Sequence, residues 1–201
     1  MPMELSNYTF ETELCEIAFK YGTDKCPQLA HTYTPFYYNL FKNKRKLIKK
    51  VLEIGIGPYR GKRPRRYTLI GSSLYMWRDF FPNALIFGAE INPAWVFEDE
   101  RIKVFQCDQK KREDLLRVVK NIGADIDLVI DDACHDLKAQ VYTCLTLMPL
   151  LKKDAVYIIE DALYSQEVKN SLKEYRCSIP RIANRGDINQ LVVVKTKNRY
   201  E

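Results

Sequence analysis

The residues whose types and positions most clearly suggest a chemical role are acids at the ends of short apolar segments. They are Glu90, Asp108 and the pairs Asp131–Asp132 and Glu160–Asp161. If these segments are neighbouring parallel strands, their ends lie together, because adjacent strands are only about 4.8 Å apart. A cluster of carboxylates is unfavourable unless a hard cation such as Mg²⁺ occupies it. The pattern therefore predicts that Asp132, Glu160 and Asp161 hold a divalent cation.

A histidine follows this acidic cluster. His135 stands three positions after Asp132 and is one of only two histidines in the chain. An imidazole beside a bound cation can take a proton from a hydroxyl group, so we expect His135 to be a general base. The other histidine, His31, precedes an aromatic segment whose tyrosines would pack the first helices onto a sheet. We expect His31 to be structural.

Alternating strands and helices would position these groups. Strands are predicted over 49–57, 84–91, 101–108, 125–132 and 155–161, and helices over 9–21, 34–46, 72–81, 111–122, 137–151 and 165–175. This alternation predicts an α/β fold with a Rossmann-like, doubly wound, mostly parallel seven-stranded sheet. Residues 177–195 predict a C-terminal antiparallel hairpin around Gly186. We expect one domain over 1–201, with an N-terminal helical cap (1–48) on a Rossmann-like core (49–201).

In such a sheet, ligands bind beyond the carboxyl ends of the strands. The first strand ends in Glu53-Ile54-Gly55-Ile56-Gly57, and its glycines would let the backbone approach a ligand closely. The next residues are Pro58, Tyr59 and Arg60, so the phosphate-binding pattern of a dinucleotide fold is not completed. Glu90, which ends the second strand, can accept hydrogen bonds from a ribose diol. The incomplete glycine pattern disfavours a nicotinamide-dependent oxidoreductase.

Composition sets broad limits. The chain has 201 residues, of which 46% are hydrophobic and 29% charged, which excludes a disordered chain. It has no apolar stretch long enough to cross a membrane, and its acidic N-terminus does not resemble a signal peptide. The six cysteines have no metal-binding spacing, so we expect reduced thiols and a cytoplasmic protein, in the host cytoplasm if it is viral. The net charge of +6 is concentrated in the runs 42–50 and 59–67, and we expect the first to be a solvated face.

Together these motifs resemble class I S-adenosylmethionine (SAM) dependent methyltransferases, and more narrowly the metal-dependent sugar O-methyltransferases of the mycinamicin and macrocin type. The matching segments are YGTDK (21–25), YTPFY (33–37), VLEIGIG (51–57), GSSLYMWRDFFPNA (71–84), VFQCDQ (104–109), IDDACHD (130–136) and YIIED (157–161). YGTDK, Asp-Asp-x-x-His and the Glu-Asp pair are specific in combination, whereas VLEIGIG alone indicates only the superfamily. The family usually has Gly-Ser before the histidine, where this chain has Ala133-Cys134.

The resemblance implies a set of site residues. It implies a SAM site that includes Thr23, Lys25, Glu53, Gly55, Gly57, Ser72, Ser73, Glu90, Asp108, Gln109 and Asp131. Glu53 and the two glycines would line the methionine moiety, and Glu90 would hold the ribose. Asp108 and Gln109 would flank the adenine, while Thr23 and Lys25 would close over the cofactor. The resemblance also implies that Asp132, Glu160 and Asp161 bind Mg²⁺ or another divalent cation and that His135 is the base.

We therefore expect a SAM- and Mg²⁺-dependent O-methyltransferase that acts on a hydroxyl of a deoxyhexose such as rhamnose, in a glycan or glycoside. A chlorovirus-type domain that methylates glycan rhamnose would be one such enzyme. The expected partner is a sugar or glycan acceptor, not a membrane and not a nucleic acid. A homo-oligomer and a larger multidomain chain both stay open. The alternatives are a catechol-type small-molecule O-methyltransferase, a nucleic-acid methyltransferase that uses the basic runs, and a non-catalytic binding protein on the same fold.

Overall fold

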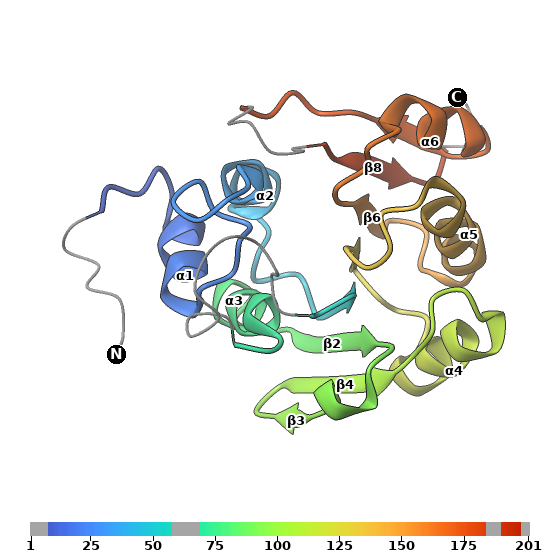
Figure 1. Ribbon diagram of the computed structural model, residues 1–201, viewed down its shortest axis with the longest axis horizontal. Helices are drawn as coiled ribbons and strands as arrows, with labels where there is room; N and C mark the ends of the chain where they lie inside the picture. Colours follow the sequence, from blue (N-terminus) through green and yellow to red (C-terminus); the bar gives the residue numbers. More distant parts are fainter. Residues whose placement is uncertain (1–7, 58–68, 184–189, 198–201) are drawn as a thin grey trace.

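A computed structural model describes residues 8–57, 69–183 and 190–197. It confirms the α/β prediction with an eight-stranded sheet of order β3-β4-β2-β1-β5-β6-β8-β7 (Figure 1). The parallel centre is formed by β1 (Lys50–Ile54), β2 (Leu85–Glu90), β4 (Ile102–Gln106), β5 (Leu128–Asp131) and β6 (Val156–Ile159). The predicted mostly parallel sheet is thus present.

Both edges of the sheet are antiparallel. At one edge, β7 (Arg176–Ser178) pairs with β8 (Val192–Lys195), which confirms the C-terminal antiparallel hairpin. Its predicted turn at Gly186 lies outside the described residues. At the other edge, the two-residue strand β3 (Glu98–Asp99) pairs with β4 and adds one strand to the seven that were predicted.

Helices cover both faces of the sheet (Figure 1). One face carries α1 (Glu13–Tyr21), α2 (Tyr33–Phe41) and α3 (Ser72–Phe80), and the other carries α4 (Arg112–Ile122), α5 (Leu137–Leu147) and α6 (Ser165–Ser171). Two 3₁₀ turns, η3 (Pro93–Trp95) and η4 (Met148–Leu150), join elements. The α2 helix is shorter than the predicted 34–46, because it ends at Phe41 and residues 42–47 form turns.

Successive residues of the central strands alternate between the two helical layers, as the pleat requires. In β1, Val51 packs with the α1–α3 layer, whereas Leu52 and Ile54 pack with the α4–α6 layer. In β6, Ile158 faces the first layer and Ile159 the second. This alternation decides on which face each acid at a strand end is buried.

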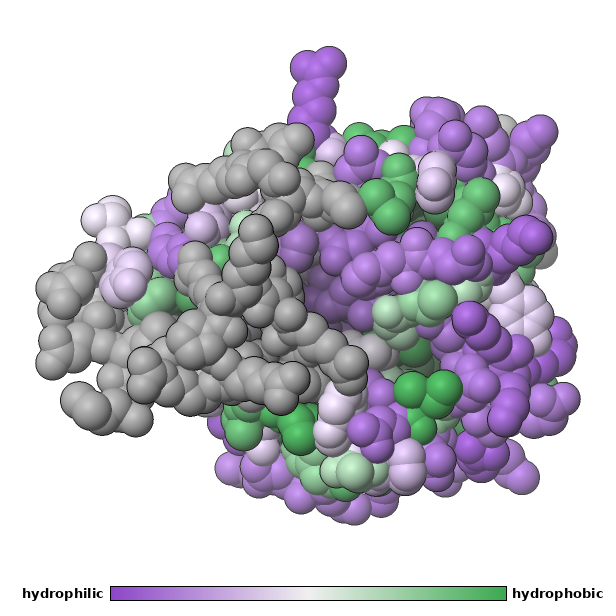
Figure 2. Space-filling model, viewed as in Figure 1, coloured by the Kyte–Doolittle hydropathy of each residue, from purple (hydrophilic) through white to green (hydrophobic). Residues whose placement is uncertain are grey.

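One face of the described residues is mostly polar. On the face shown in Figure 2, hydrophilic residues predominate and hydrophobic residues form small separate patches. Among the described residues, no helix combines the length and apolar character that a membrane span requires. All six cysteines are free, as predicted.

Candidate active site

A cavity of about 610 Å³ opens at the carboxyl ends of the parallel strands. It lies beside β1, where the strand order reverses, because β2 and β4 follow on one side of β1 and β5 and β6 on the other. Twelve of the predicted site residues line it: Thr23, Lys25, Gly55, Gly57, Ser72, Ser73, Glu90, Asp108, Gln109, Asp132, His135 and Asp161. The other three, Glu53, Asp131 and Glu160, are fully buried and are not part of the lining.

The glycines after β1 allow close packing around the cavity. Gly55 has a φ of +84°, and a Cβ atom at this position would lie 2.4 Å from Cα of Ala133 in the loop after β5. A Cβ atom at Gly57 would lie 2.9 Å from the ring of Trp95, which also lines the cavity. Larger residues would therefore push the walls of the cavity apart.

Glu90 is held at the end of β2 by backbone donors. Its Oε2 accepts a hydrogen bond from the amide of Ile56 at 3.2 Å, and its Oε1 accepts one from the amide of Asn92 at 2.9 Å. A carboxylate has about four acceptor positions, so this fixed group can still accept from a ligand hydroxyl.

The loop after β4 is ordered by its own acids. The Asp108 amide donates to Oδ2 of Asp114 at 2.9 Å, and Oδ1 of Asp108 accepts from the amide of Lys110 at 3.0 Å. On the opposite wall, Ser72 and Ser73 begin α3, directly after Gly71 with its φ of +69°.

Asp131 faces away from the cavity, toward the α4–α6 layer. Its Oδ2 accepts from the hydroxyl of Tyr157 at 3.0 Å, and its Oδ1 accepts from Nε2 of Gln109 at 3.2 Å. Gln109 Oε1 accepts in turn from the amide of Cys134 at 2.7 Å. Burial raises the pKa of Asp131 to about 7. Asp131 thus supports the cavity through Gln109, and a direct contact with a cofactor stays a prediction.

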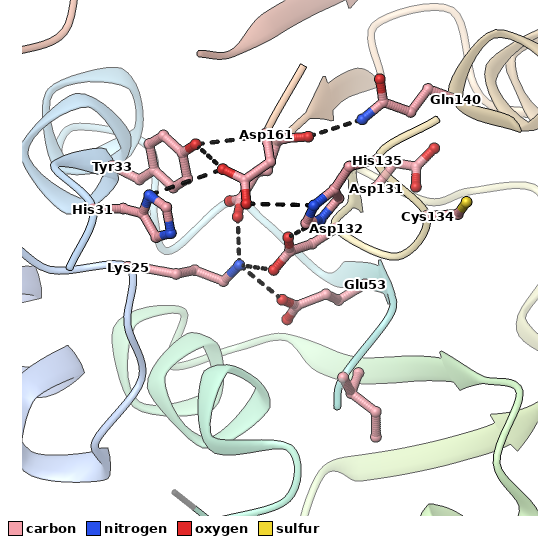
Figure 3. Close-up of polar contacts among 12 residues, drawn as sticks. Lys25, His31, Tyr33, Glu53, Asp131, Asp132, Cys134, His135, Gln140 and Asp161 are labelled. Atoms are coloured by element: carbon pink, nitrogen blue, oxygen red, sulfur yellow. Dashed lines mark hydrogen bonds and ion pairs between the residues drawn. The ribbon is translucent and has the colours of Figure 1, made fainter. Parts of the chain in front are cut away.

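The ammonium group of Lys25 is buried among three carboxylates (Figure 3). Its Nζ lies 2.5 Å from Oδ2 of Asp132 and 3.3 Å from Oε1 of Glu53, and it also donates to Oε2 of Glu160. Burial opposes the charge of Lys25, but these acids outweigh it and hold the pKa of Lys25 well above its usual range.

Lys25 lowers the pKa of all three acids, but their net pKa shifts differ. Burial raises the pKa of Glu53, and it raises the pKa of Glu160 well above its ordinary value, although Lys25 opposes both shifts. Burial acts in the same direction on Asp132, but Lys25 and His135 outweigh it, so the pKa of Asp132 is lowered. Asp132 is therefore an ionised carboxylate in the cavity wall.

Asp132, His135 and Asp161 could together hold a metal ion. Nε2 of His135 lies 3.5 Å from Oδ1 of Asp132, and its Nδ1 lies 3.7 Å from Oδ2 of Asp161. One ligand atom from each residue lies within 4.8 Å of the other two. Two carboxylates and an imidazole suit a divalent cation, so the donor set fits. The hydrogen-bonding Asp132 carboxylate raises the pKa of His135 against the effect of burial.

The predicted cation ligands are thus separated by the fold. Asp132 and Asp161 line the cavity, whereas Glu160 points to Lys25 and to Tyr37, whose hydroxyl donates to Oε1 at 2.6 Å. Glu160 continues the alternation of β6 and lies, like Ile158, on the side of the α1–α3 layer, whereas Asp161 departs from the alternation with a φ of +48°. His135, predicted as the base, stands between the two carboxylates in the cavity (Figure 3).

Several groups from the N-terminal segment were not predicted. His31, expected to be structural, lines the cavity with Asp24, and its Nδ1 lies 3.8 Å from Oδ1 of Asp161. The His31 ring stacks on Tyr33 at 4.9 Å, and the Tyr33 hydroxyl donates to the same oxygen of Asp161. The spacing of Tyr33 and Tyr37 marks one helical face. No sequence signal shows what this face contacts.

No family model matches the chain. It is similar to mycinamicin VI 2''-O-methyltransferase of Micromonospora griseorubida, with 37% identity over 150 residues, which cover 74% of this chain and 36% of that protein. It is also similar to 8-demethyl-8-(2-methoxy-alpha-L-rhamnosyl)-tetracenomycin-C 3'-O-methyltransferase of Streptomyces olivaceus, with 35% identity over 149 residues and the same coverage of 74% and 36%. The chain thus spans about a third of the length of these curated relatives.

A solved structure is similar over a greater part of the chain. It is the MycE methyltransferase from the mycinamycin biosynthetic pathway in complex with Mg and SAH, with a TM-score of 0.71 and 27% identity. The match covers 92% of this chain and 54% of MycE. A second MycE structure, which also contains mycinamycin VI, matches with the same TM-score at 25% identity.

Proposed function

The chain is a homologue of sugar O-methyltransferases of the mycinamicin, tetracenomycin and macrocin type, and we propose that it methylates a sugar hydroxyl with SAM and a divalent cation such as Mg²⁺. The proposed acceptor is a deoxyhexose such as rhamnose in a glycan or glycoside. The observation that supports the proposal most strongly is that the candidate SAM site and the candidate cation site lie in the same cavity. The glycine turn and Glu90 line it together with Asp132, His135 and Asp161.

The cofactor side of the cavity would bind SAM, which supplies an activated methyl group. We propose that Glu90 accepts hydrogen bonds from the ribose, because its carboxylate is fixed by two backbone amides. Asp108 and Gln109 would flank the adenine, and Gly55 and Gly57 would leave room for the methionine part. Thr23, Ser72 and Ser73 would complete this side of the cavity.

The acidic side would hold the cation. Asp132 and Asp161 line the cavity there, and Glu160 lies directly behind them with Lys25. A divalent cation bound there would lower the pKa of a coordinated acceptor hydroxyl. Lys25 would keep Asp132 ionised. Asp161 would present its carboxylate to the same cation, on the side of the cavity where the acceptor binds.

His135 would remove the proton of the acceptor hydroxyl. Its imidazole lies between the two cavity carboxylates, and Asp132 raises its pKa, which makes it a stronger base. General base catalysis contributes typically about 10²–10⁴-fold to the rate. Holding the acceptor and the methyl donor in line can contribute up to about 7–11 kcal/mol in well-aligned systems.

The test is transfer of label from methyl-labelled SAM to a panel of a rhamnoside, catechol and RNA, with and without a chelator. We expect label on the rhamnoside that disappears with the chelator and returns with Mg²⁺. Methyl transfer that is unchanged by the chelator would rule out the proposed metal-binding role of Asp132, Glu160 and Asp161. Absence of transfer to every acceptor, together with no binding of SAM in calorimetry, would reject the proposal.

The catechol and RNA acceptors represent the two rival functions. The basic run 59–67 lies outside the described residues. In the run 42–50, Arg45 is 2.8 Å from Glu13, and Lys50 is 2.6 Å from Asp125. These pairs neutralise part of the charge that a polyanion would need. We also propose that 1–201 is one domain with a helical cap over 1–48. The same transfer assay can measure the activity of this domain within a longer chain or in an oligomer.

A further inference from the structure

Two tyrosines of α2 contact the two acids that follow β6. Tyr33 and Tyr37 are four positions apart and therefore lie on the same face of the helix. The Tyr37 hydroxyl donates to Oε1 of Glu160 at 2.6 Å, and the Tyr33 hydroxyl donates to Oδ1 of Asp161 (Figure 3 shows the second contact). Both tyrosines are buried, at 0% and 1% exposure. The contact of Tyr37 with Glu160 is buried, and the contact of Tyr33 with Asp161 is partly buried at the wall of the cavity.

Asp161 has a backbone conformation that needs such support. Its φ is +48°, in the left-handed region that residues other than glycine rarely adopt. Conformations of this kind persist where the surroundings impose them, and they cluster at functional sites. In this protein the residue concerned is one of the two carboxylates of the candidate cation site, with Asp132.

Tyr33 contacts both the backbone and the side chain of Asp161. Its hydroxyl accepts from the Asp161 amide at 3.4 Å while it donates to Oδ1 of the same residue. The His31 ring stacks on Tyr33 with an interplanar angle of 5°, and its Nδ1 is 3.8 Å from the same Oδ1. One carboxylate oxygen of Asp161 is thus bound from the N-terminal segment. The other, Oδ2, lies 3.7 Å from His135.

We propose that Tyr33 is a positioning residue of the cation site, which sets cation affinity by holding Asp161 in its left-handed conformation with Oδ2 toward His135 and Asp132. The inference rests on the proposed function, since it requires that a cation binds there. Groups that orient metal ligands from behind typically change metal affinity or activity 10–100-fold when they are replaced. The N-terminal helices are then part of the catalytic apparatus, beyond their packing role.

The experiment compares Mn²⁺ binding to the full chain and to its Tyr33→Phe variant by titration calorimetry, without SAM or acceptor. Tyr33→Phe keeps the ring that stacks on His31 and removes only the hydroxyl. The control is Tyr38→Phe, because Tyr38 lies on the same helix and its ring packs against Phe80 at 6.2 Å. We expect the Kd for Mn²⁺ to rise 10–100-fold in Tyr33→Phe and to stay within about twofold in Tyr38→Phe.

Two further readouts separate positioning from general damage. SAH binding in the presence of a chelator should be unchanged in Tyr33→Phe. The same excess of Mn²⁺ should raise its Tm less than that of the unaltered protein, because the stabilisation depends on the ratio of the Mn²⁺ concentration to the Kd. An unchanged Kd for Mn²⁺ would overturn the inference and leave the proposed function standing. A Tyr33→Phe variant that does not fold, or that loses SAH and Mn²⁺ binding together, would also overturn the inference, because Tyr33 would then have a general structural role. If the unaltered protein binds no Mn²⁺, the metal part of the proposed function fails with it.

Discussion

The Lys25 ammonium lies 2.5 Å from Oδ2 of Asp132, although 107 positions separate the two residues in the sequence. This contact joins the segment between α1 and α2 to the loop after β5, across the floor of the cavity. Because Lys25 also contacts Glu53 and Glu160, one positive charge balances acids from three different strand ends. The charge state of the candidate cation site therefore depends on a residue outside the Rossmann-like core.

Replacing Lys25 by Met should destabilise the protein strongly. The change leaves buried carboxylates without their partner, which costs about 3–5 kcal/mol in comparable buried pairs. The cost should be smaller at pH 5.5 than at pH 8, because protons can neutralise the acids that remain. Urea unfolding at both pH values measures it.

Lys20→Met is the matched control for this change. Lys20 forms an exposed ion pair with Asp79 at 3.2 Å, and its side chain is 55% exposed. Pairs of this kind contribute about 0–1 kcal/mol. Equal losses of stability in the two variants would show that Lys25 has no special electrostatic role.

Asp131 should make the stability depend on pH. Its pKa is about 7 in the folded protein because of burial, whereas an unfolded Asp titrates near 3.9. The folded state therefore keeps a proton that the unfolded state releases, so this contribution to stability is complete below pH 4 and is lost as the pH rises to about 7. Between pH 5.5 and 8 the loss amounts to about 2 kcal/mol.

Asp131→Asn removes this titration while it keeps a side chain of the same size. We expect its free energy of unfolding to fall by about 2 kcal/mol less than that of the unaltered protein between pH 5.5 and 8. Asp154→Asn, at a side chain that is 83% exposed, should follow the unaltered protein. Parallel pH profiles for all three proteins would contradict the assignment.

The two glycines after β1 should respond differently to alanine. Gly55→Ala combines a positive φ with a Cβ atom 2.4 Å from the Ala133 backbone, so it should cost at least about 2 kcal/mol and abolish SAH binding. In Gly57→Ala the new Cβ atom meets only the Trp95 side chain, which can shift. We expect this variant to keep most of its stability and to bind SAH more weakly. Calorimetry and thermal unfolding distinguish the two, and a stable Gly55→Ala protein with normal SAH affinity would refute the packing argument.

His135→Gln should separate a base from a metal ligand. If His135 takes the proton of the acceptor, methyl transfer should slow by about 10²–10⁴-fold while Mn²⁺ and SAH still bind as before. Lys138→Gln, at an exposed position of α5, is the control. A loss of Mn²⁺ affinity as large as the loss of rate would instead make His135 a ligand together with Asp132 and Asp161.

Much of the architecture could be predicted from local patterns. Strands and helices alternate visibly because apolar residues recur with different periods in each, and acids at strand ends of a parallel sheet must share one edge. The cavity accordingly contains twelve of the predicted site residues. The strand pleat also indicates that Glu160 lies on the α1–α3 side, a signal in the sequence that was not used. The left-handed backbone of Asp161, which Tyr33 of the same layer contacts, departs from this alternation.

The contacts from the N-terminal segment could not be predicted in this way. Whether Lys25, His31 and Tyr33 meet the acids depends on how the N-terminal segment packs on the rest of the protein, for example on the contact of Tyr37 in α2 with Trp77 in α3 at 4.9 Å. Such packing brings together residues more than a hundred positions apart, and no local periodicity encodes it. The sequence by itself determined the order of the elements and the placement of the acids at one sheet edge. Only the tertiary structure decided which acids face the cavity and which side chains hold them there, because both depend on long-range packing.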